Sequence, residues 1–301
     1  CPVPAAAARV VRNRCRASVM RKTPDPERAA AIAYWKGRPA SADEPALFWS
    51  WYSPRNFGDW ITPWLYRRMT GREPRFCPVA ETEDRDCIFA AGSILRHLRH
   101  PGRVTVWGSG IINRDDSFAA PRRTLAVRGP LTRARVLALG YPCPAVFGDP
   151  AILLPLFLQP AADRVRRPFG IAPHFVDHAR LGAMALPAGM VIDVTQPVEE
   201  VVAGITACDC IFASSLHGLI VAHAYGIPAV WIRSGTPIMG DDTKFHDYYA
   251  SVGLQVDPLE LPAPTTELLE RHAAASTLPD QSPLRAPLLA ACPFPSRDAG
   301  G

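Results

Sequence analysis

Short apolar runs alternate with amphipathic segments along most of the chain. Apolar runs of about four to eight residues that end in glycine or polar residues are typical of buried strands. In the first half we predict strands or strand ends at PALFWSWY (45–52), CIFAAGS (87–93), RVTVWGSGI (103–111), TLAVRGP (124–130) and AVFGDPAILL (145–154). In the second half the same pattern predicts strands at FGIAPHF (169–175), MVIDV (190–194), CIFASS (210–215) and IPAVWI (227–232).

Segments with a helical spacing of apolar residues lie between these strands. A glycine just after the last periodic residue is a common helix stop, because glycine adopts the left-handed conformation without strain. Gly71 and Gly140 take that position in the first half. The predicted helices are WITPWLYRRMTG (60–71), LTRARVLALG (131–140), QPVEEVVAGITACD (196–209), LHGLIVAHAYG (216–226) and TTELLERHAAA (265–275).

This alternation predicts an α/β fold, because strands separated by helices form parallel sheets covered on both faces. The Pro-rich, charged stretch QPAADRVRRP (159–168) separates two such series. We therefore expect two Rossmann-like domains that face each other across a cleft. The expected units are an N-terminal arm (1–44), a first domain (45–160), a second domain (161–265) and a C-terminal helix and tail (266–301).

Composition narrows the class of protein. Of 301 residues, 48% are hydrophobic and 20% are charged, which is a globular composition. The longest apolar run, AILLPLFL (151–158), is far shorter than the ~20 residues of a membrane span. The net charge of +5 does not demand nucleic acid, and it suits an anionic small ligand or a membrane surface equally well. We expect a soluble, cytoplasmic protein that binds no nucleic acid, and we leave peripheral contact with the inner face of the membrane open.

Cysteine and histidine spacing gives no reason to expect a metal. The eight cysteines include no CxxC pair, which disfavours a zinc ribbon. Cys208 and Cys210 are either a metal or redox pair or two buried thiols, and the apolar strand that follows favours buried thiols. His174 and His178 are four residues apart, but His174 follows a proline at a strand end, so we expect no metal pair there.

Polar and glycine residues collect at the predicted strand ends. In parallel sheets the carboxyl ends of the strands share one edge, where ligands bind. Helix N-termini at this edge would favour an anion, and Ser214 or Ser215 would cap a helix or bind an oxyanion. The strand-end segments are NFGD (56–59), AGS (91–93), WGSG (107–110), VRG (127–129), FGDP (147–150), PHF (173–175) and SSLHG (214–218).

His217 and Arg128 are the candidates for chemistry at this edge. His217 falls in the first turn of its predicted helix, and it is either a proton carrier near neutral pH or a core histidine. Arg128 ends a strand, where its planar fork suits phosphate or carboxylate, although a surface salt bridge would also explain it. Gly129 would let a ligand or backbone approach closely. His223 lies about 120° around the helix from His217 and is expected to pack in the core.

An ordered set of these motifs resembles the polysaccharide pyruvyl transferase family over roughly residues 50 to 255. The set is NFGDWITPWLYRRMTG, VWGSGI, AVRGPLTRARVLALG, FGDPAILLP, PHFVDH and SSLHGLIVAHAYGIPAVWI, with SSLHG as the most specific part. The resemblance implies a two-domain, GT-B-like fold. It also implies phosphoenolpyruvate as co-substrate without another cofactor, and a sugar of a cell-surface polysaccharide or its lipid-linked precursor as acceptor. The product that the resemblance implies is a pyruvate ketal, formed with release of phosphate.

The resemblance also implies roles for residues. His217 matches the essential histidine, and Arg128 matches the arginine that binds the acidic groups of the donor, although Gly129 stands where an acidic residue is more usual. We expect the catalytic group to comprise His217, Arg128 and Asp149, with Asp149 or Asp59 activating an acceptor hydroxyl. The first domain is expected to take the acceptor and the second the donor. The expected substrate-binding residues are Asn56, Gly58, Asp59, Ser109, His174, Ser214, Ser215, Gly218 and Lys244.

Several alternatives stay open at this point. Lys244, in DDTKFHDYY (241–249), either reaches the donor or is a solvated charge. A GT-B glycosyltransferase would use the same helix terminus for a sugar nucleotide, with Asp241 and Asp242 as the only acidic residues in the loop after the last predicted strand. A non-catalytic carbohydrate-binding protein would need neither His217 nor Arg128. The aromatic segment WSWYSPRNFGDWITPW (49–64) either lines an acceptor site or belongs to the core.

Overall fold

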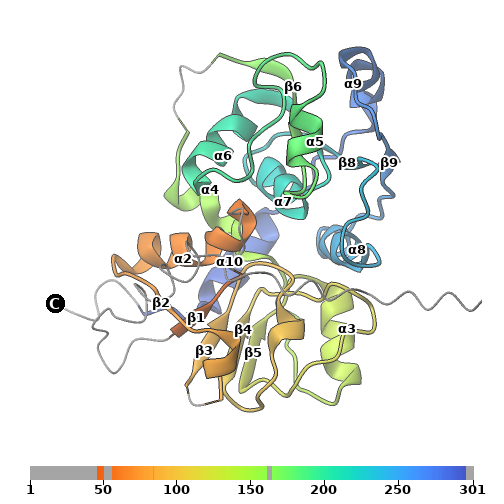
Figure 1. The fold of residues 1–301 in the computed structure, drawn as a ribbon. Helices are drawn as coiled ribbons and strands as arrows, with labels where there is room; N and C mark the ends of the chain where they lie inside the picture. The colour runs from red at the N-terminus through yellow and green to blue at the C-terminus, as the bar shows by residue number, and fades with distance from the viewer. Residues whose placement is uncertain (1–45, 51–55, 84, 161–164, 296–301) are drawn as a thin grey trace, which may run out of the picture.

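The computed structural model describes residues 46–50, 56–83, 85–160 and 165–295, and it shows a mixed α/β structure with two parallel sheets (Figure 1). The first sheet has the order β2 (Arg75–Phe76), β1 (Ala46–Phe48), β3 (Cys87–Phe89), β4 (Val104–Trp107) and β5 (Arg123–Ala126). The second has the order β6 (Arg167–Ala172), β7 (Cys208–Ala213), β8 (Ala229–Arg233) and β9 (Leu259–Glu260). The predicted α/β class is confirmed.

Helices connect the strands of both sheets and complete the chain. The α-helices are α2 (Phe57–Thr70), α3 (Pro130–Ala138), α4 (Leu154–Phe157), α5 (His178–Gly182), α6 (Val198–Thr206), α7 (Leu216–Ala224), α8 (Thr243–Ser251), α9 (Thr266–His272) and α10 (Ser282–Ala290). Short 3-10 turns are η1 (Val79–Glu81), η2 (Leu95–His97), η3 (Pro150–Leu153) and η4 (Ala273–Ala275). In both sheets, short turns or loops with polar residues follow the ends of the strands.

The glycine stops act as predicted, but α2 begins earlier than expected. Gly71 caps α2 with a φ of 72°, and Gly140 follows α3 with a φ of 82°. The segment 56–59, predicted as a loop, instead holds the Asn56 cap and the first turn of the helix. The start at Phe57 is fixed from outside the helix, because its N–H donates to the carbonyl of Val194 at 3.0 Å.

Two of the predicted strands form only single bridges. In the segment 145–154, Phe147 pairs with Val127, and then Gly148 takes a φ of 132° and Pro150 has no N–H to continue a ladder. In the segment 190–194, Val191 pairs with Ile171. There the chain turns as the Asp193 carboxylate accepts a hydrogen bond from the N–H of Thr195. Short polar turns therefore end pairing that the apolar pattern favoured.

Four α-helices were not predicted: the short α4 and α5, and the longer α8 and α10. Helix α8 buries Phe245, Tyr248 and Tyr249, a helical spacing that is visible in the sequence but is interrupted there by charged residues. Helix α10 contains Pro283 and Pro287, which read as breakers, yet a proline in the first turn loses no helical hydrogen bond. Tertiary contact then stabilises α10, which falls in the predicted tail (266–301).

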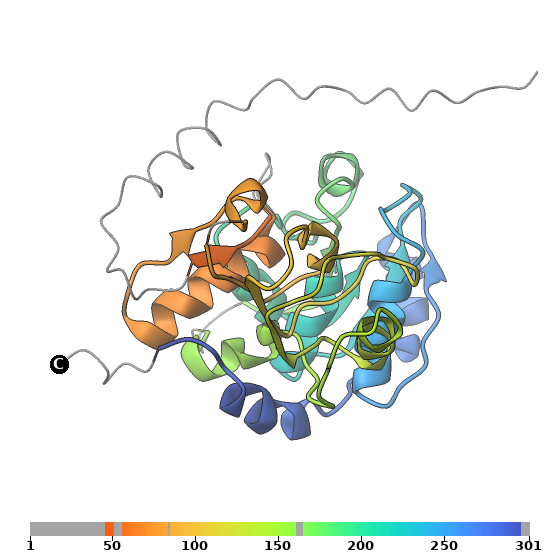
Figure 2. The ribbon, with the colours of Figure 1, turned by 90° about the horizontal axis from the view of Figure 1, so that it is seen from below.

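The C-terminal segment returns to the first sheet. The carbonyl of Leu288 in α10 accepts a hydrogen bond from Nε1 of Trp107 at 2.8 Å. Phe294 packs edge-on against Trp107 and Tyr66, with ring centroids 5.0 and 5.1 Å apart. Figures 1 and 2 show α10 lying against the half of the molecule that contains the first sheet. The end of the described chain therefore packs against α2 and β4 in the half of the molecule that contains the first sheet.

Candidate active site

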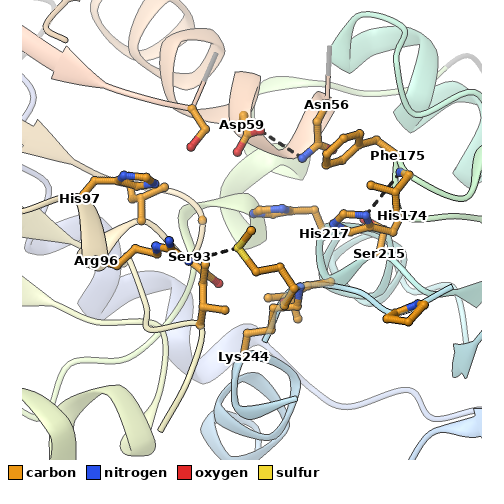
Figure 3. A pocket seen from close by; sticks show the side chains of 18 residues that line it. Asn56, Asp59, Ser93, Arg96, His97, His174, Phe175, Ser215, His217 and Lys244 are labelled. Carbon is orange, nitrogen blue, oxygen red and sulfur yellow. Dashed lines mark hydrogen bonds between the residues drawn. The ribbon is translucent and has the colours of Figure 1, made fainter. Parts of the chain in front are cut away.

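A cavity of about 290 Å³ lies where loops from both sheets meet (Figure 3). Its walls come from the start of α2, the segment after β3, the segment after β6, the start of α7 and the segment between β8 and α8. These segments follow the carboxyl ends of strands, where ligands are expected in parallel sheets. Of the predicted site residues, those that line the cavity are Asn56, Asp59, His174, Ser215, His217 and Lys244.

His217 enters the cavity from the first turn of α7. Ser215 caps this helix, because its hydroxyl accepts a hydrogen bond from the N–H of Gly218 at 3.3 Å. His217 is only 8% exposed. It packs so closely against α2 that a Cβ on Gly58 would lie 2.1 Å from its Nδ1. Gly58 thus makes room for the histidine and does not itself line the cavity.

Asp149 fixes the other side of the His217 ring. Its Oδ2 lies 3.5 Å from His217 Nε2, longer than a good hydrogen bond, and Nε2 has no hydrogen-bond partner among the described residues. Backbone N–H groups hold the carboxylate, from Ala151 at 3.0 Å and from Gly92 at 3.1 Å. Burial opposes ionisation, but His217 and these hydrogen bonds outweigh it, so the pKa of Asp149 lies below its ordinary value. Asp149 is therefore an ionised group outside the cavity lining that contacts two lining residues, His217 and Gly92.

Asp59 lines the cavity, and its pKa is shifted in the opposite direction to that of Asp149. Burial raises the pKa of Asp59 to about 6, although His217, Asn56 and Lys244 each lower it in part. Asn56 donates a hydrogen bond from Nδ2 to Asp59 Oδ2 at 3.1 Å. A carboxyl that titrates near neutral pH can give or take a proton there. The two carboxyls beside His217 thus differ in pKa because their surroundings differ.

Lys244 supplies a cation to the cavity from the first turn of α8. It is only 8% exposed, so the alternative of a solvated surface charge does not describe it. Burial and the nearby Arg128 lower the pKa of Lys244 to about 8, against a partial rise from Asp242 and Asp59. Its Nζ donates to the carbonyl of Met239 at 3.2 Å. Lys244 is therefore a mainly protonated ammonium at neutral pH with a single neutral acceptor.

His174 completes this wall as a neutral ring. Burial, with a smaller contribution from Lys244, lowers the pKa of His174 to about 4. Its backbone N–H donates to the Ser214 hydroxyl at 2.9 Å, and Ser214 is fully buried. Ser214 therefore holds the segment after β6 and does not reach the cavity. His174 can offer a ligand a hydrogen bond but no charge.

Arg128 lies outside the cavity, unlike the expectation for a donor-binding residue. It is fully buried, and its Nε donates to Asp247 Oδ2 at 3.0 Å. Nη2 donates to the carbonyl of Ile111 at 2.6 Å, and Nη1 donates to the hydroxyl of Ser93. All three nitrogens therefore have protein acceptors. The guanidinium joins the first sheet to α8 and is not presented to a ligand in this structure.

Glycines next to Arg128 allow this arrangement. A Cβ on Gly110 would lie 2.3 Å from the Arg128 Cζ, and one on Gly129 would lie 2.0 Å from the carbonyl oxygen of Asp247. The close approach expected at Gly129 is therefore made by the backbone of α8. Asp247 also accepts hydrogen bonds from the N–H and hydroxyl of Thr132, at 2.9 and 2.6 Å.

Ser109 and Gly218 also have supporting positions. The Ser109 hydroxyl is fully buried and donates to the carbonyl of Gly92 at 2.9 Å, which shapes the segment after β3. A Cβ on Gly218 would lie 2.8 Å from the Cβ of Ala172, so glycine lets α7 pack closely on β6. Neither residue lines the cavity.

Sequence reasoning missed several residues that line the cavity. Arg96 and His97 lie in η2, just beyond the strand-end segment 91–93, and Met239 lies between β8 and α8. Burial, together with Arg96 and Arg99, lowers the pKa of His97 to about 4. The signal for Arg96 and His97 was their closeness to a strand end. No pattern in the sequence marks Met239.

Other candidate groups lie in the core. His223 is 4% exposed, and its Nδ1 is 2.6 Å from the Tyr248 hydroxyl, so its predicted packing role is confirmed. Cys208 and Cys210 are buried free thiols in β7, as favoured. Within the described part of the chain, no group of three or more His, Cys, Asp or Glu residues could hold a metal ion. No helix of the described residues is long and apolar enough to cross a membrane.

The aromatic segment contributes to packing more than to the cavity. Trp49 and Trp64 are 1% and 6% exposed, and Trp60 packs against Trp49 with ring centroids 6.2 Å apart. None of these three indoles lines the cavity. Residues 51–55 of the segment lie outside the described residues.

Comparison with known proteins identifies the family. A model of the family described as polysaccharide pyruvyl transferase matches residues 38–236, more than half of the chain. The chain belongs to the polysaccharide pyruvyl transferase family. The match includes the cavity segments up to the end of β8, with His217 and Asp149 among them, and stops before Met239 and Lys244.

One curated relative of this family member is an uncharacterised protein of Acanthamoeba polyphaga mimivirus. The two are 32% identical over 166 residues, which are 51% of this chain and 56% of that protein. The chain therefore spans little more than half the length of the relative it matches. No solved structure matches the chain.

Proposed function

We propose that this chain transfers the pyruvyl group of phosphoenolpyruvate to a sugar, forms a pyruvate ketal and releases phosphate. The acceptor would be a sugar of a cell-surface polysaccharide or of its lipid-linked precursor. One observation carries the proposal: His217, backed by the Asp149 carboxylate, shares a cavity with the buried ammonium of Lys244. A proton carrier beside a site for an anion is what this reaction needs.

In this proposal the donor binds on the side of the cavity that the C-terminal half of the chain forms. The N-terminus of α7 presents backbone N–H groups and a partial positive charge, which favour a phosphate. Lys244 adds a full positive charge with spare hydrogen-bonding capacity. Neutral His174 adds a donor without repelling the ammonium. No cofactor beyond phosphoenolpyruvate as co-substrate is part of the proposal.

The chemistry begins with a proton on the methylene carbon of phosphoenolpyruvate. His217 would donate it, which leaves an oxocarbenium-like centre at the neighbouring carbon. A sugar hydroxyl adds to that carbon and gives its proton to a base, for which Asp59, with a pKa of about 6, is suited. Phosphate leaves with a proton, and a second hydroxyl closes the ketal. Of the two hydroxyl protons, one replaces that given to the new methyl group and one leaves on phosphate.

Asp149 and Arg128 take positioning roles in this scheme. Asp149 keeps the His217 ring oriented, because its Oδ2 lies 3.5 Å from His217 Nε2. Arg128 fixes α8, which carries Lys244, against the first sheet through Asp247. The earlier assignment of Arg128 to the donor's acidic groups is therefore replaced in this proposal by Lys244.

In this proposal the two halves of the chain bind different substrates. We take residues 45–160 and 161–265 as two Rossmann-like domains in a GT-B-like arrangement, with the acceptor on the first and the donor on the second. Support comes from the cavity lining, which combines Asp59 and His97 from the first half with His217 and Lys244 from the second. With such an acceptor, the protein would work in the cytoplasm, with peripheral contact to the inner face of the membrane where a lipid-linked precursor is the acceptor.

A sugar-nucleotide donor fits the loop after β8 less well. The Asp241 carboxylate accepts hydrogen bonds from the N–H groups of Arg114 and Thr243, at 3.0 and 3.1 Å. Asp242 forms an ion pair with Arg233. Neither aspartate lines the cavity, so neither is free there to bind a ribose.

The test measures phosphate release from phosphoenolpyruvate with candidate acceptors. We expect His217→Gln to lower kcat by about 10²- to 10⁴-fold, the usual contribution of a general acid. His178→Gln is the matched control, because His178 pairs with Asp193 outside the cavity. Near-normal turnover by His217→Gln would contradict the proposal. Thermal stabilisation by UDP- or GDP-sugars but not by phosphoenolpyruvate would favour a glycosyltransferase instead.

A further inference from the structure

Arg96 is a basic residue of the cavity to which the scheme above gives no role. It lies in η2, a single turn after β3, and it is exposed and lines the cavity. Its Nη1 donates to Met239 Sδ at 3.1 Å. A thioether is a weak acceptor, so most of the donor capacity of this guanidinium is unused. Among the described residues, no acidic side chain forms an ion pair with Arg96.

Met239 links Arg96 to the other cation of the cavity. Its sulfur accepts from Arg96, and its carbonyl accepts from Lys244 Nζ at 3.2 Å. The Met239 side chain is 64% exposed and therefore free to move aside. The two positive charges thus reach one residue from the two halves of the molecule. A ligand that displaces the Met239 side chain would gain a charged partner in place of a weak one.

The charged side chains that line the cavity favour an anionic ligand. Asp59 is the one acidic residue among the described residues that line it, against the cations Arg96 and Lys244. Figure 3 shows Arg96 and His97 on one side of the cavity, and Ser215 and His217, at the start of α7, on the other. The Arg96 side chain and the N-terminus of α7 therefore lie on opposite sides of the space where a ligand would bind.

We propose that Arg96 binds the carboxylate of phosphoenolpyruvate while Lys244 and the N-terminus of α7 bind its phosphate. This assignment rests on the proposed function. The planar fork of an arginine matches a planar carboxylate with two parallel hydrogen bonds. A helix N-terminus with a lysine suits a phosphate. The donor would then bridge the two halves, with its reacting carbons between Arg96 and His217.

The experiment measures the Kd of phosphoenolpyruvate and of inorganic phosphate by calorimetry, for the full chain and its variants. Arg96→Ala should weaken phosphoenolpyruvate binding on the order of 10- to 100-fold, as the loss of a charge-assisted hydrogen bond predicts. It should leave phosphate binding within about twofold, because the carboxylate is absent from that probe. Arg96→Lys should lie between, because it keeps the charge and loses the fork.

Two further variants complete the design. Lys244→Met should weaken the binding of both probes, because both contain phosphate. Arg99→Ala is the matched control, since Arg99 is an exposed arginine two residues beyond η2 that does not line the cavity, and it should change neither Kd. Arg96 and Arg99 are both exposed, so we expect both variants to fold with the wild-type Tm.

The outcomes separate the assignment from the function on which it rests. If wild type binds phosphoenolpyruvate and Arg96→Ala binds it as Arg99→Ala does, the assignment is wrong and the function stands. If Arg96→Ala weakens phosphate as strongly as phosphoenolpyruvate, Arg96 binds the phosphate and the assignment is again wrong. If wild type does not bind phosphoenolpyruvate, the proposed function fails and takes the assignment with it.

Discussion

Helix α8 places two charged residues, Asp247 and Lys244, in opposite environments. Asp247 is fully buried and bonded to Arg128 and Thr132, so its charge and its lone pairs are used inside the protein. Lys244 is almost as buried, yet its ammonium has one carbonyl as its acceptor and faces the cavity. Burial alone therefore does not distinguish a charged residue that stabilises the fold from one that binds a ligand. The distinguishing feature is hydrogen-bonding capacity that is left unused inside a cavity.

The comparison makes Asp247 the residue whose loss should destabilise most. Asp247→Ala leaves the Arg128 guanidinium buried without its counter-charge, which costs about 3–5 kcal/mol of unfolding free energy. Urea unfolding followed by circular dichroism measures this. The exposed pair Arg166 and Asp209 is the control, and Asp209→Ala should cost at most about 1 kcal/mol.

A double variant sharpens the same prediction. Arg128→Met with Asp247→Leu removes both charges, so it should be less destabilised than Asp247→Ala alone. If Asp247→Ala and the double variant were both as stable as wild type, the contact would not hold α8 to the first sheet. The idea that Arg128 positions Lys244 would then lose its basis.

Lys244 should show its function in the pH dependence of binding. Its pKa of about 8 means that raising the pH from 7 to 9 removes most of its charge, so phosphoenolpyruvate should bind about tenfold more weakly at pH 9. Lys244→Arg should abolish this loss, because arginine stays protonated. Kd values from pH 6.5 to 9.5 test it. The same alkaline loss in both proteins would assign the titration to another group.

Asp59 should show its effect in the pH dependence of stability. Folding raises its pKa from 3.8 to about 6, so between these values the folded chain keeps a proton that the unfolded chain has lost. Its contribution to the unfolding free energy therefore falls as the pH rises through that window. Asp59→Asn, which keeps a hydrogen-bonding partner for Asn56, should gain stability relative to wild type from pH 4 to pH 7. A difference that does not change with pH would show that Asp59 has an ordinary pKa.

Part of the fold and of the site followed from local patterns. The helix stops at Gly71 and Gly140 and the Ser215 cap depend on residues within one helical turn. The position of His217 at a helix start depends on that same cap, and its place in the cavity follows from the general rule for parallel sheets. The helix α10 escaped prediction because its prolines argue against a helix locally, while Trp107 and Phe294 stabilise it from elsewhere.

The sequence by itself determined the α/β class, the order of most strands and helices, and the edge at which a site would form. These depend on apolar spacing and glycine positions over a few residues, which local sterics and burial make decisive. Only the tertiary structure decided that Lys244 faces the cavity while Arg128 does not. The deciding contact joins Arg128 to Asp247, 119 positions away, and nothing near either residue encodes whether its charge will be satisfied.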